Sequence, residues 1–192
     1  MTGAINQTRR DALNAGIALA LAGCTSTQEG SALMTQTQAP ATPSARPGDF
    51  DFLSGEWRIA HRRLLPSGQW DVFDGEATVF GILNGVGSVE ELRIPARDFS
   101  GMGLRLLNVQ ESVWQDFWVN GKLGVLTPPG MPGRFINGAG VFEADEMDGD
   151  QPIKVRGIWD EITPRSCRWR QAVSRDGGAS WDENWVMQWV RV

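Results

Sequence analysis

The sequence predicts an all-β fold, a closed antiparallel up-and-down β-barrel of about nine or ten strands. Turn signals recur at strand-length intervals, the runs between them are rich in β-branched and aromatic residues, and no helical period is sustained after the first two dozen residues. Because crossover helices are absent from this pattern, consecutive strands are expected to pair antiparallel. A β-sandwich is the alternative.

The expected strands follow one another along the chain. Their runs cover residues 57–64, 75–83, 103–110, 113–120, 153–160, 169–174 and 185–190. The turn signals lie at residues 66–69, 84–85, 120–121, 148–150, 163–165 and 176–178. Most of these segments therefore form hairpins with their neighbours.

The last of these turns lies in S-R-D-G-G-A-S-W, from Ser174 to Trp181. As a pattern, S-x-D-x-G-x-x-W resembles the Asp-box of sialidase-type propellers, where the box recurs blade by blade and lies away from the catalytic centre. This chain holds one copy between two strand-like runs. We therefore interpret it as a hairpin turn and not as part of a glycosidase.

The first 23 residues differ in character from the rest. Arg9 and Arg10 precede an apolar run at 12–22, which is too short to span a bilayer as a helix, and L-A-G-C ends at Cys24. The arginine pair resembles a twin-arginine export signal, and L-A-G-C resembles the lipobox of bacterial lipoproteins. This resemblance implies an exported lipoprotein, acylated at Cys24 and held on the periplasmic face of the cell envelope, for example at the outer membrane.

Three segments are therefore expected: a signal at 1–23, a tether at 24–48 and the barrel domain at 49–192. The tether is rich in Thr, Gln, Ser, Ala and Pro and has no hydrophobic period, so it cannot bury enough apolar surface to offset its ordering entropy.

Composition excludes several classes of function. The formal net charge is −5 and the sequence has no basic stripe, so nucleic acid is not an expected partner. His61 is the only histidine, which excludes a two-histidine zinc site, and we expect no metal and no cofactor. A haem held by His61 is the alternative. If Cys24 carries lipid, Cys167 has no partner for a disulfide and is expected to be a small buried apolar residue.

The start of the domain, F-D-F-L-S-G-E-W at 50–57, contains G-x-W just before the first strand and resembles the lipocalin signature. In that group an arginine near the chain end stacks over the tryptophan, and Arg191 is placed to do so over Trp57. F-D-F-L-x-G-x-W, the W-x-x-x-W of 114–118, the I-x-W ending at 159 and the S-x-D-G-G-x-x-W-x-x-N-W-x-M of 174–187 together resemble a bacterial domain family of unknown function, numbered 1579. The resemblance implies a lipocalin-like, calycin-type barrel over about residues 50–192 and no established activity.

Two-residue alternation places several tryptophans on common strand faces that would point inward. We predict a tryptophan-lined lumen that binds a small hydrophobic or aromatic ligand. The predicted ligand-binding residues are Trp57, His61, Glu91, Arg105, Trp118, Trp159, Gln171, Glu183 and Trp185.

Two alternatives stay open. One carboxylate of each adjacent pair, such as 90–91 or 182–183, would face inward, and an inward carboxylate shielded from water could act as the acid or base of a lyase, isomerase or cyclase. Alternatively, the nine tryptophans could fill the lumen completely, which would leave a structural envelope lipoprotein with a packed barrel.

Overall fold

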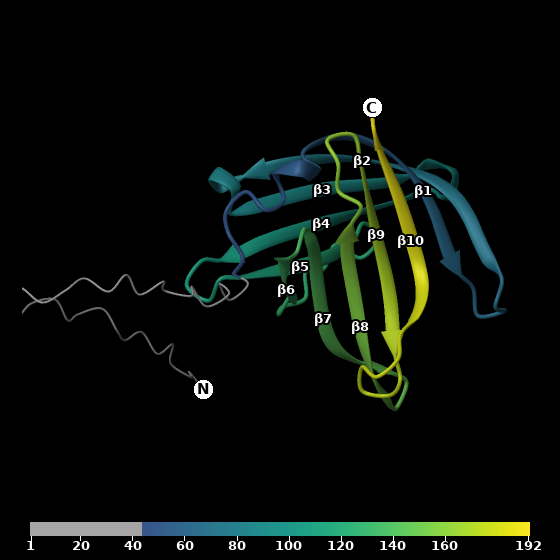
Figure 1. The fold of residues 1–192 in the computed structure, drawn as a ribbon. Helices are drawn as coiled ribbons and strands as arrows, with labels where there is room; N and C mark the ends of the chain where they lie inside the picture. The colour runs from purple at the N-terminus through teal and green to yellow at the C-terminus, as the bar shows by residue number, and fades with distance from the viewer. Residues whose placement is uncertain (1–43) are drawn as a thin grey trace, which may run out of the picture. The chain divides into compact units, whose positions relative to one another are not determined.

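The computed structural model describes residues 44–192, which form a ten-stranded antiparallel barrel (Figure 1). The strands are β1 (Gly55–Leu64), β2 (Trp70–Ile82), β3 (Gly87–Ile94), β4 (Phe99–Asn108), β5 (Val113–Asn120), β6 (Met131–Ile136), β7 (Ala139–Asp148), β8 (Gln151–Asp160), β9 (Ser166–Ser174) and β10 (Asp182–Arg191). Each strand pairs with its neighbours along the chain, and β10 pairs with β1 to close the sheet. The predicted barrel is confirmed, and the predicted signal at 1–23 and Cys24 lie outside the described residues.

The regular helical structure in the described part of the chain consists of three short 3-10 segments: η1 (Asp51–Leu53), η2 (Leu83–Gly85) and η3 (Pro95–Arg97). No helix among residues 44–192 has the length and apolar character needed to cross a bilayer. The strand runs predicted from the sequence include none for β3, β6 or β7, whose turns lie at 95–98 and 137–138.

The hairpin turn predicted between Ser174 and Trp181 is confirmed, since Asp176 lies in the connection between β9 and β10. Its carboxylate accepts hydrogen bonds from the Ser174 hydroxyl (2.7 Å), the Ser180 hydroxyl (2.6 Å) and the Ser180 backbone N–H (2.9 Å). These hydrogen bonds hold the pKa of Asp176 well below its usual range. The Asp-box here is a device that fixes a turn.

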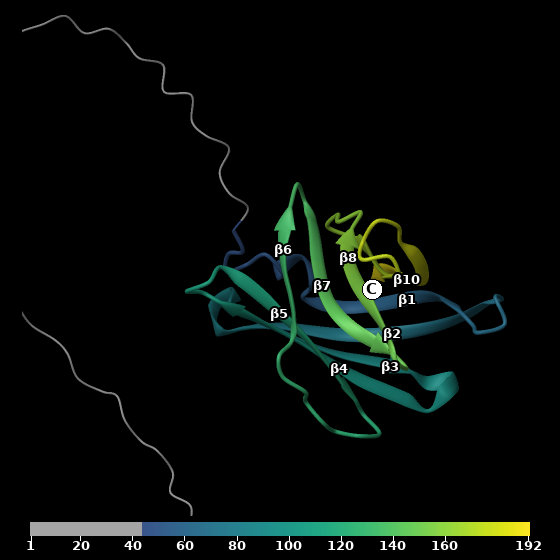
Figure 2. The same ribbon diagram turned by 90° about the horizontal axis from the view of Figure 1, so that it is seen from below.

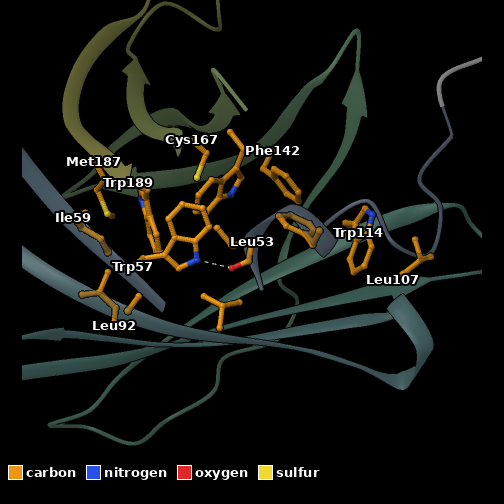
Figure 3. Close-up of a cluster of buried hydrophobic side chains, with 14 of the residues drawn as sticks. Leu53, Trp57, Ile59, Leu92, Leu107, Trp114, Phe142, Cys167, Met187 and Trp189 are labelled. Atoms are coloured by element: carbon orange, nitrogen blue, oxygen red, sulfur yellow. Dashed lines mark hydrogen bonds between the residues drawn. The ribbon is translucent and has the colours of Figure 1, made fainter. Parts of the chain in front are cut away.

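One end of the barrel is closed by the segment that precedes β1. Phe50 and Leu53 are buried there, and the indole N–H of Trp57 donates to the backbone carbonyl of Leu53 at 2.7 Å (Figure 3). Phe50 meets Trp114 edge to face with 4.9 Å between ring centroids. Ala45 is also buried, and its N–H donates to the carbonyl of Ser112, so the packed part of the chain extends back to residue 45.

Arg191 locks this closed end. Its guanidinium lies 4.2 Å from the Trp57 ring centroid and donates to the carbonyls of Phe52, Ser54 and Pro164 at 2.6, 2.5 and 2.9 Å. The predicted stacking of Arg191 on Trp57 is confirmed. Arg191 therefore connects the last strand to the first strand and to the segment before β1 that closes this end of the barrel.

The interior is therefore packed at one end. Trp57, Trp159 and Trp189 are almost fully buried, and Cys167 lies among them as predicted for a small apolar residue. Burial raises the pKa of the Cys167 thiol to about 12, which keeps it un-ionised.

The β5–β6 connection, residues 121–130, is the longest loop of the barrel and projects from its wall (Figure 2). Leu123, Val125 and Leu126 are exposed on it. The Gly- and Pro-rich stretch at 127–133 ends this loop and enters β6, which begins at Met131.

Candidate functional site

A cavity of about 300 Å³ occupies the barrel interior beyond the packed end. Its wall is mainly apolar and aromatic, and polar groups lie on one side. The lining residues are Glu90, Leu92, Gly103, Arg105, Asp116, Phe117, Trp118, Met131, Glu146, Val155, Gly157, Trp159, Trp169, Gln171, Trp185, Met187 and Trp189. Trp118 and Glu146 are exposed and mark the mouth of this cavity.

A buried ionic group formed by Arg105, Glu90 and Asp116 lies in the cavity wall. Arg105 Nη2 donates to Glu90 Oε2 at 2.6 Å, and Arg105 Nε lies 3.6 Å from Asp116 Oδ1. These side chains come from β4, β3 and β5, and register places Gly103 opposite Glu90 and Arg105 opposite Asp116. Gly103 leaves room for the charged pair, because a side chain there would crowd both the guanidinium and the Glu90 carboxylate.

The three charges differ in their access to water. The side chains of Arg105 and Glu90 are 5% and 3% exposed, whereas that of Asp116 is 22% exposed. Burial, assisted by the charge of Glu90, raises the pKa of Asp116 to about 6 against the opposing effect of Arg105. Burial by itself would lower the pKa of Arg105, but the two carboxylates outweigh it and raise that pKa. The pKa of Asp116 therefore lies close to neutral pH.

Several buried donors at this site have no acceptor among residues 44–192. They are Nε and Nη1 of Arg105 and the indole N–H groups of Trp159 and Trp189. The Arg105 guanidinium also lies 5.1 Å from the Trp159 ring centroid. Because buried donors in proteins are generally hydrogen-bonded, their grouping beside a cavity is a feature of a binding site.

Five of the predicted ligand-binding residues line this cavity together: Arg105, Trp118, Trp159, Gln171 and Trp185. The Gln171 amide donates to Asn184 Oδ1 at 3.1 Å, which holds it in position. Glu90, Trp169 and Trp189 also line the cavity and are not among the residues predicted from the sequence, although Trp169 lies two residues from Gln171 on β9 and Trp189 four residues from Trp185 on β10.

Trp57 and His61 point inward but do not line the cavity. Trp57 belongs to the closed end, and His61 stacks on Phe73 with 4.5 Å between centroids. The Trp185 indole N–H donates to His61 Nδ1 at 3.4 Å. Burial, with the nearby charge of Arg97, lowers the pKa of His61 to about 4, so the ring is neutral at physiological pH.

Two of the predicted ligand-binding residues, Glu91 and Glu183, have side chains on the outer face of the barrel, so the prediction that they face the lumen is wrong. Glu91 is exposed and pairs with Arg93 at 2.9 Å, while its neighbour Glu90 points inward. As predicted, one glutamate of the pair faces inward and the other outward. The sequence S-V-E-E-L-R-I does not determine which one faces inward, because the apolar residues Val89 and Leu92, on either side of the pair, lie on opposite faces of β3.

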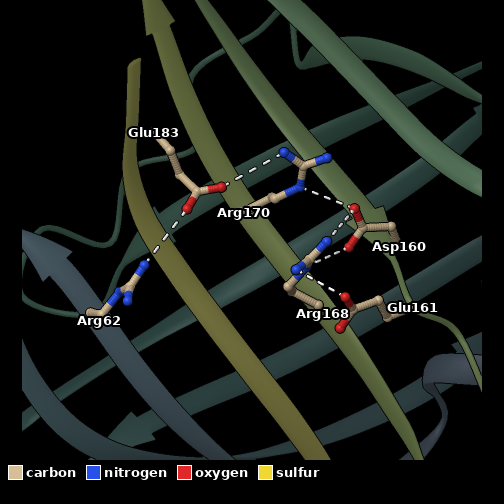
Figure 4. A network of polar contacts seen from close by, with 6 residues as sticks. All are labelled: Arg62, Asp160, Glu161, Arg168, Arg170 and Glu183. Atoms are coloured by element: carbon tan, nitrogen blue, oxygen red, sulfur yellow. Dashed lines mark hydrogen bonds and ion pairs between the residues drawn. The ribbon is translucent and has the colours of Figure 1, made fainter. Parts of the chain in front are cut away.

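Glu183 is turned outward by a bulge. The register of β10 against β9 shifts between Glu183 and Trp185, so the extra residue Asn184 breaks the two-residue alternation. Glu183 instead joins an outer network, in which it pairs with Arg62 (4.0 Å) and Arg170 (3.7 Å) (Figure 4). The network continues through Asp160, Glu161 and Arg168.

Comparisons with known proteins add the following. No family model and no curated protein matches the sequence. An S-type phycobiliprotein lyase from Guillardia theta is 10% identical, with a TM-score of 0.49 over 74% of this chain and 90% of its own. A protein of unknown function from the DUF3598 family of Nostoc punctiforme is 13% identical, with a TM-score of 0.43 over 81% of this chain and 53% of its own. These likenesses are too weak to carry an inference about ligand or activity, and the resemblance to the family numbered 1579 stays a prediction.

Proposed function

We propose that the barrel binds a small hydrophobic or aromatic molecule in the cavity between its packed end and Trp118. The observation that carries this proposal is the cavity itself, with a volume of about 300 Å³ and a wall that includes five tryptophans. Protein sites for small molecules are hollows of roughly 300 Å³ or more, mostly apolar and with a few fixed polar groups. The cavity has this composition, and its indole rings offer flat faces for stacking.

Tryptophan fluorescence tests the proposal directly, because the cavity wall contains the reporter. The full-length chain would be titrated with aromatic and fatty ligands, and the titration repeated with Trp118→Ala and Trp185→Ala. Trp70→Ala is the matched control, since Trp70 lies on the outer surface under Arg62 at 4.4 Å from the ring centroid. Saturable quenching that the cavity variants weaken and Trp70→Ala keeps is the expected result. Absence of quenching by every ligand class would refute ligand binding.

A second candidate function is catalysis within the cavity by Asp116. A carboxyl group that lines a largely apolar cavity and has a pKa of about 6 is suited to general acid or base work in a lyase, isomerase or cyclase. Chromatographic assay of any bound compound for conversion, with Asp116→Asn as the comparison, decides between binding and catalysis. Conversion at the same rate in Asp116→Asn would exclude this role.

We further propose that the protein is exported and anchored through an acylated Cys24. The support is the arrangement of Arg9, Arg10, the apolar run and L-A-G-C. Mass spectrometry of the mature N-terminus and membrane fractionation, compared with Cys24→Ser, test it. An unmodified Cys24 in the membrane-free fraction would overturn the proposal.

A further inference from the structure

We infer that the ligand of this cavity carries an anionic head group, which accepts a hydrogen bond from the free Nη1 of Arg105, and that Asp116 takes up a proton as the ligand enters. The inference rests on the proposed binding function and specifies the chemical class of the ligand. It also predicts a pH dependence that a purely apolar ligand would not show.

The unpartnered donors of Arg105 are the first observation. Arg105 is 4% exposed, and its Nη2 is engaged by Glu90 at 2.6 Å. Its Nε and Nη1 donate to no acceptor in the described part of the chain. Asp116 lies 3.6 Å from Nε, which is within the range of an ion pair but beyond that of a hydrogen bond. Nε–H and the Nη1 hydrogens lie on different sides of the guanidinium, and Nε lies beside Asp116, so Nη1 is the buried donor left for an oxyanion.

Charge balance is the second observation. Arg105 neutralises Glu90, and Asp116, when ionised, adds a second negative charge beside them. An anion that entered this site would be repelled by an ionised Asp116. Protonation of Asp116 removes that repulsion, so the entering anion replaces the charge of Asp116 and the total charge of the group is conserved.

The charged groups around Asp116 come from the two strands that carry its neighbours in the ionic group. Glu90 of β3 and Arg105 of β4 are the charges beside it, and Met131 faces it from β6. Among the residues of the other strands that line the cavity, the ionisable one is Glu146 of β7, at the mouth. Cys167 of β9 lies outside this lining, and its thiol stays un-ionised. The lining residues of β8 and β10 are uncharged. The pKa of Asp116, at about 6, lies in the range where ligand binding can be measured in the folded protein.

Two fluorescent probes that differ only in an anionic group test the contribution of that group to binding. 8-Anilinonaphthalene-1-sulfonate and N-phenyl-1-naphthylamine share one aromatic body, and only the first carries a sulfonate. Because a sulfonate stays ionised across the accessible pH range, any pH dependence of its affinity arises from the protein. The full-length chain with Cys24→Ser, which cannot be acylated, allows both titrations without detergent.

The sulfonate probe is expected to bind more tightly as the pH falls from 8 to 5. If only the protonated form of Asp116 is competent, its Kd changes by up to about 100-fold over this interval. Asp116→Asn should bind the sulfonate probe at pH 8 about as well as the parent protein does at pH 5. Glu111→Gln is the matched control, since Glu111 is an exposed carboxylate on the β4–β5 turn, and it should keep the parent pH profile. The neutral probe should bind with one affinity throughout.

The outcomes separate this inference from the proposed function. Equal binding of both probes at all pH values, with quenching lost in Trp118→Ala, would overturn the anionic head group and leave the cavity as a binding site. Failure of both probes to bind would count against both proposals. Arg105→Lys gives an independent check, because a lysine has one nitrogen in place of Nη1 and Nη2 and cannot hold Glu90 as Nη2 does while offering a separate donor to the ligand: we expect weaker binding of the sulfonate probe and unchanged binding of the neutral one. Retention of sulfonate affinity in a folded Arg105→Lys variant would overturn the role of Arg105.

Discussion

The guanidinium of Arg191 lies 4.2 Å from the centroid of the Trp57 ring, so the last strand of the barrel covers the tryptophan that opens the first. The same group donates to three backbone carbonyls at the closed end. Arg191→Ala removes a cation–π contact and leaves these carbonyls without their charged donor. We expect a loss of about 2 to 4 kcal/mol in the free energy of unfolding, measured by urea denaturation.

Arg175→Ala is the control for that measurement, since Arg175 forms an exposed ion pair with Asp148 at 2.7 Å. Surface pairs contribute at most about 1 kcal/mol. A similar loss in the free energy of unfolding in both variants would show that Arg191 contributes no more than an exposed ion pair does.

Asp116 makes the stability of the barrel depend on pH in a direction unusual for an acidic residue. Its folded pKa of about 6 lies above the ordinary value of 3.8, so the folded state binds more protons than the unfolded state between these two values, and stability falls as the pH rises through them. Asp116→Asn removes this effect. We expect the variant to be more stable than the parent by about 1 to 3 kcal/mol at pH 7.5 and nearly equal at pH 4, by denaturation at both pH values. A less stable Asp116→Asn at pH 7.5 would contradict the raised pKa.

His61 acts on the same pH range with the opposite sign. Its pKa falls from the ordinary 6.5 to about 4 on folding, so the unfolded state binds more protons between these values and stability falls as the pH drops. His61→Gln, which cannot be protonated, should lose less stability than the parent between pH 6.5 and pH 4. Chemical denaturation at half-unit pH steps measures this difference, and NMR titration of the single histidine reports its pKa directly. A histidine titrating near 6.5 would contradict its burial against Phe73.

Two glycines on either side of Phe142 predict unequal responses to the same substitution. Gly133 and Gly157 both pair with Phe142, from β6 and β8. A methyl group at Gly133 would collide with the Phe142 ring, whereas one at Gly157 would meet Trp169 at an ordinary 3.5 Å. We expect Gly133→Ala to lower the melting temperature, with a cost of about 1 to 3 kcal/mol, and Gly157→Ala to stay within about 0.5 kcal/mol of the parent. Equal losses of stability in the two variants would contradict the close contact between Gly133 and the Phe142 ring.

Much of this fold could be predicted from local chemistry. Turn residues located six of the connections but not those at 95–98 and 137–138, and alternation placed Trp57, Trp159 and Trp185 inside. The errors in the site arose where two-residue alternation cannot determine which side chains face the lumen. Asn184 inserts one residue into β10, and Glu90 and Glu91 are identical, so neither marks the inner face of β3. The division of the interior into a packed end and a cavity could not be predicted either, because it depends on how Phe50 and Leu53 fold back under the barrel.

The pairing of β1 with β10 also bears on how the chain folds. Register sets Trp57 opposite Arg191, across nearly the whole length of the domain, while every other strand pair joins neighbours in the chain. The hairpins can therefore form locally and early, but the loop closure that joins the two outermost strands carries the largest entropic cost. We expect substitutions in this seam, such as Ile59→Val or Trp189→Phe, to slow refolding more than equally destabilising substitutions within a hairpin, which stopped-flow fluorescence would detect.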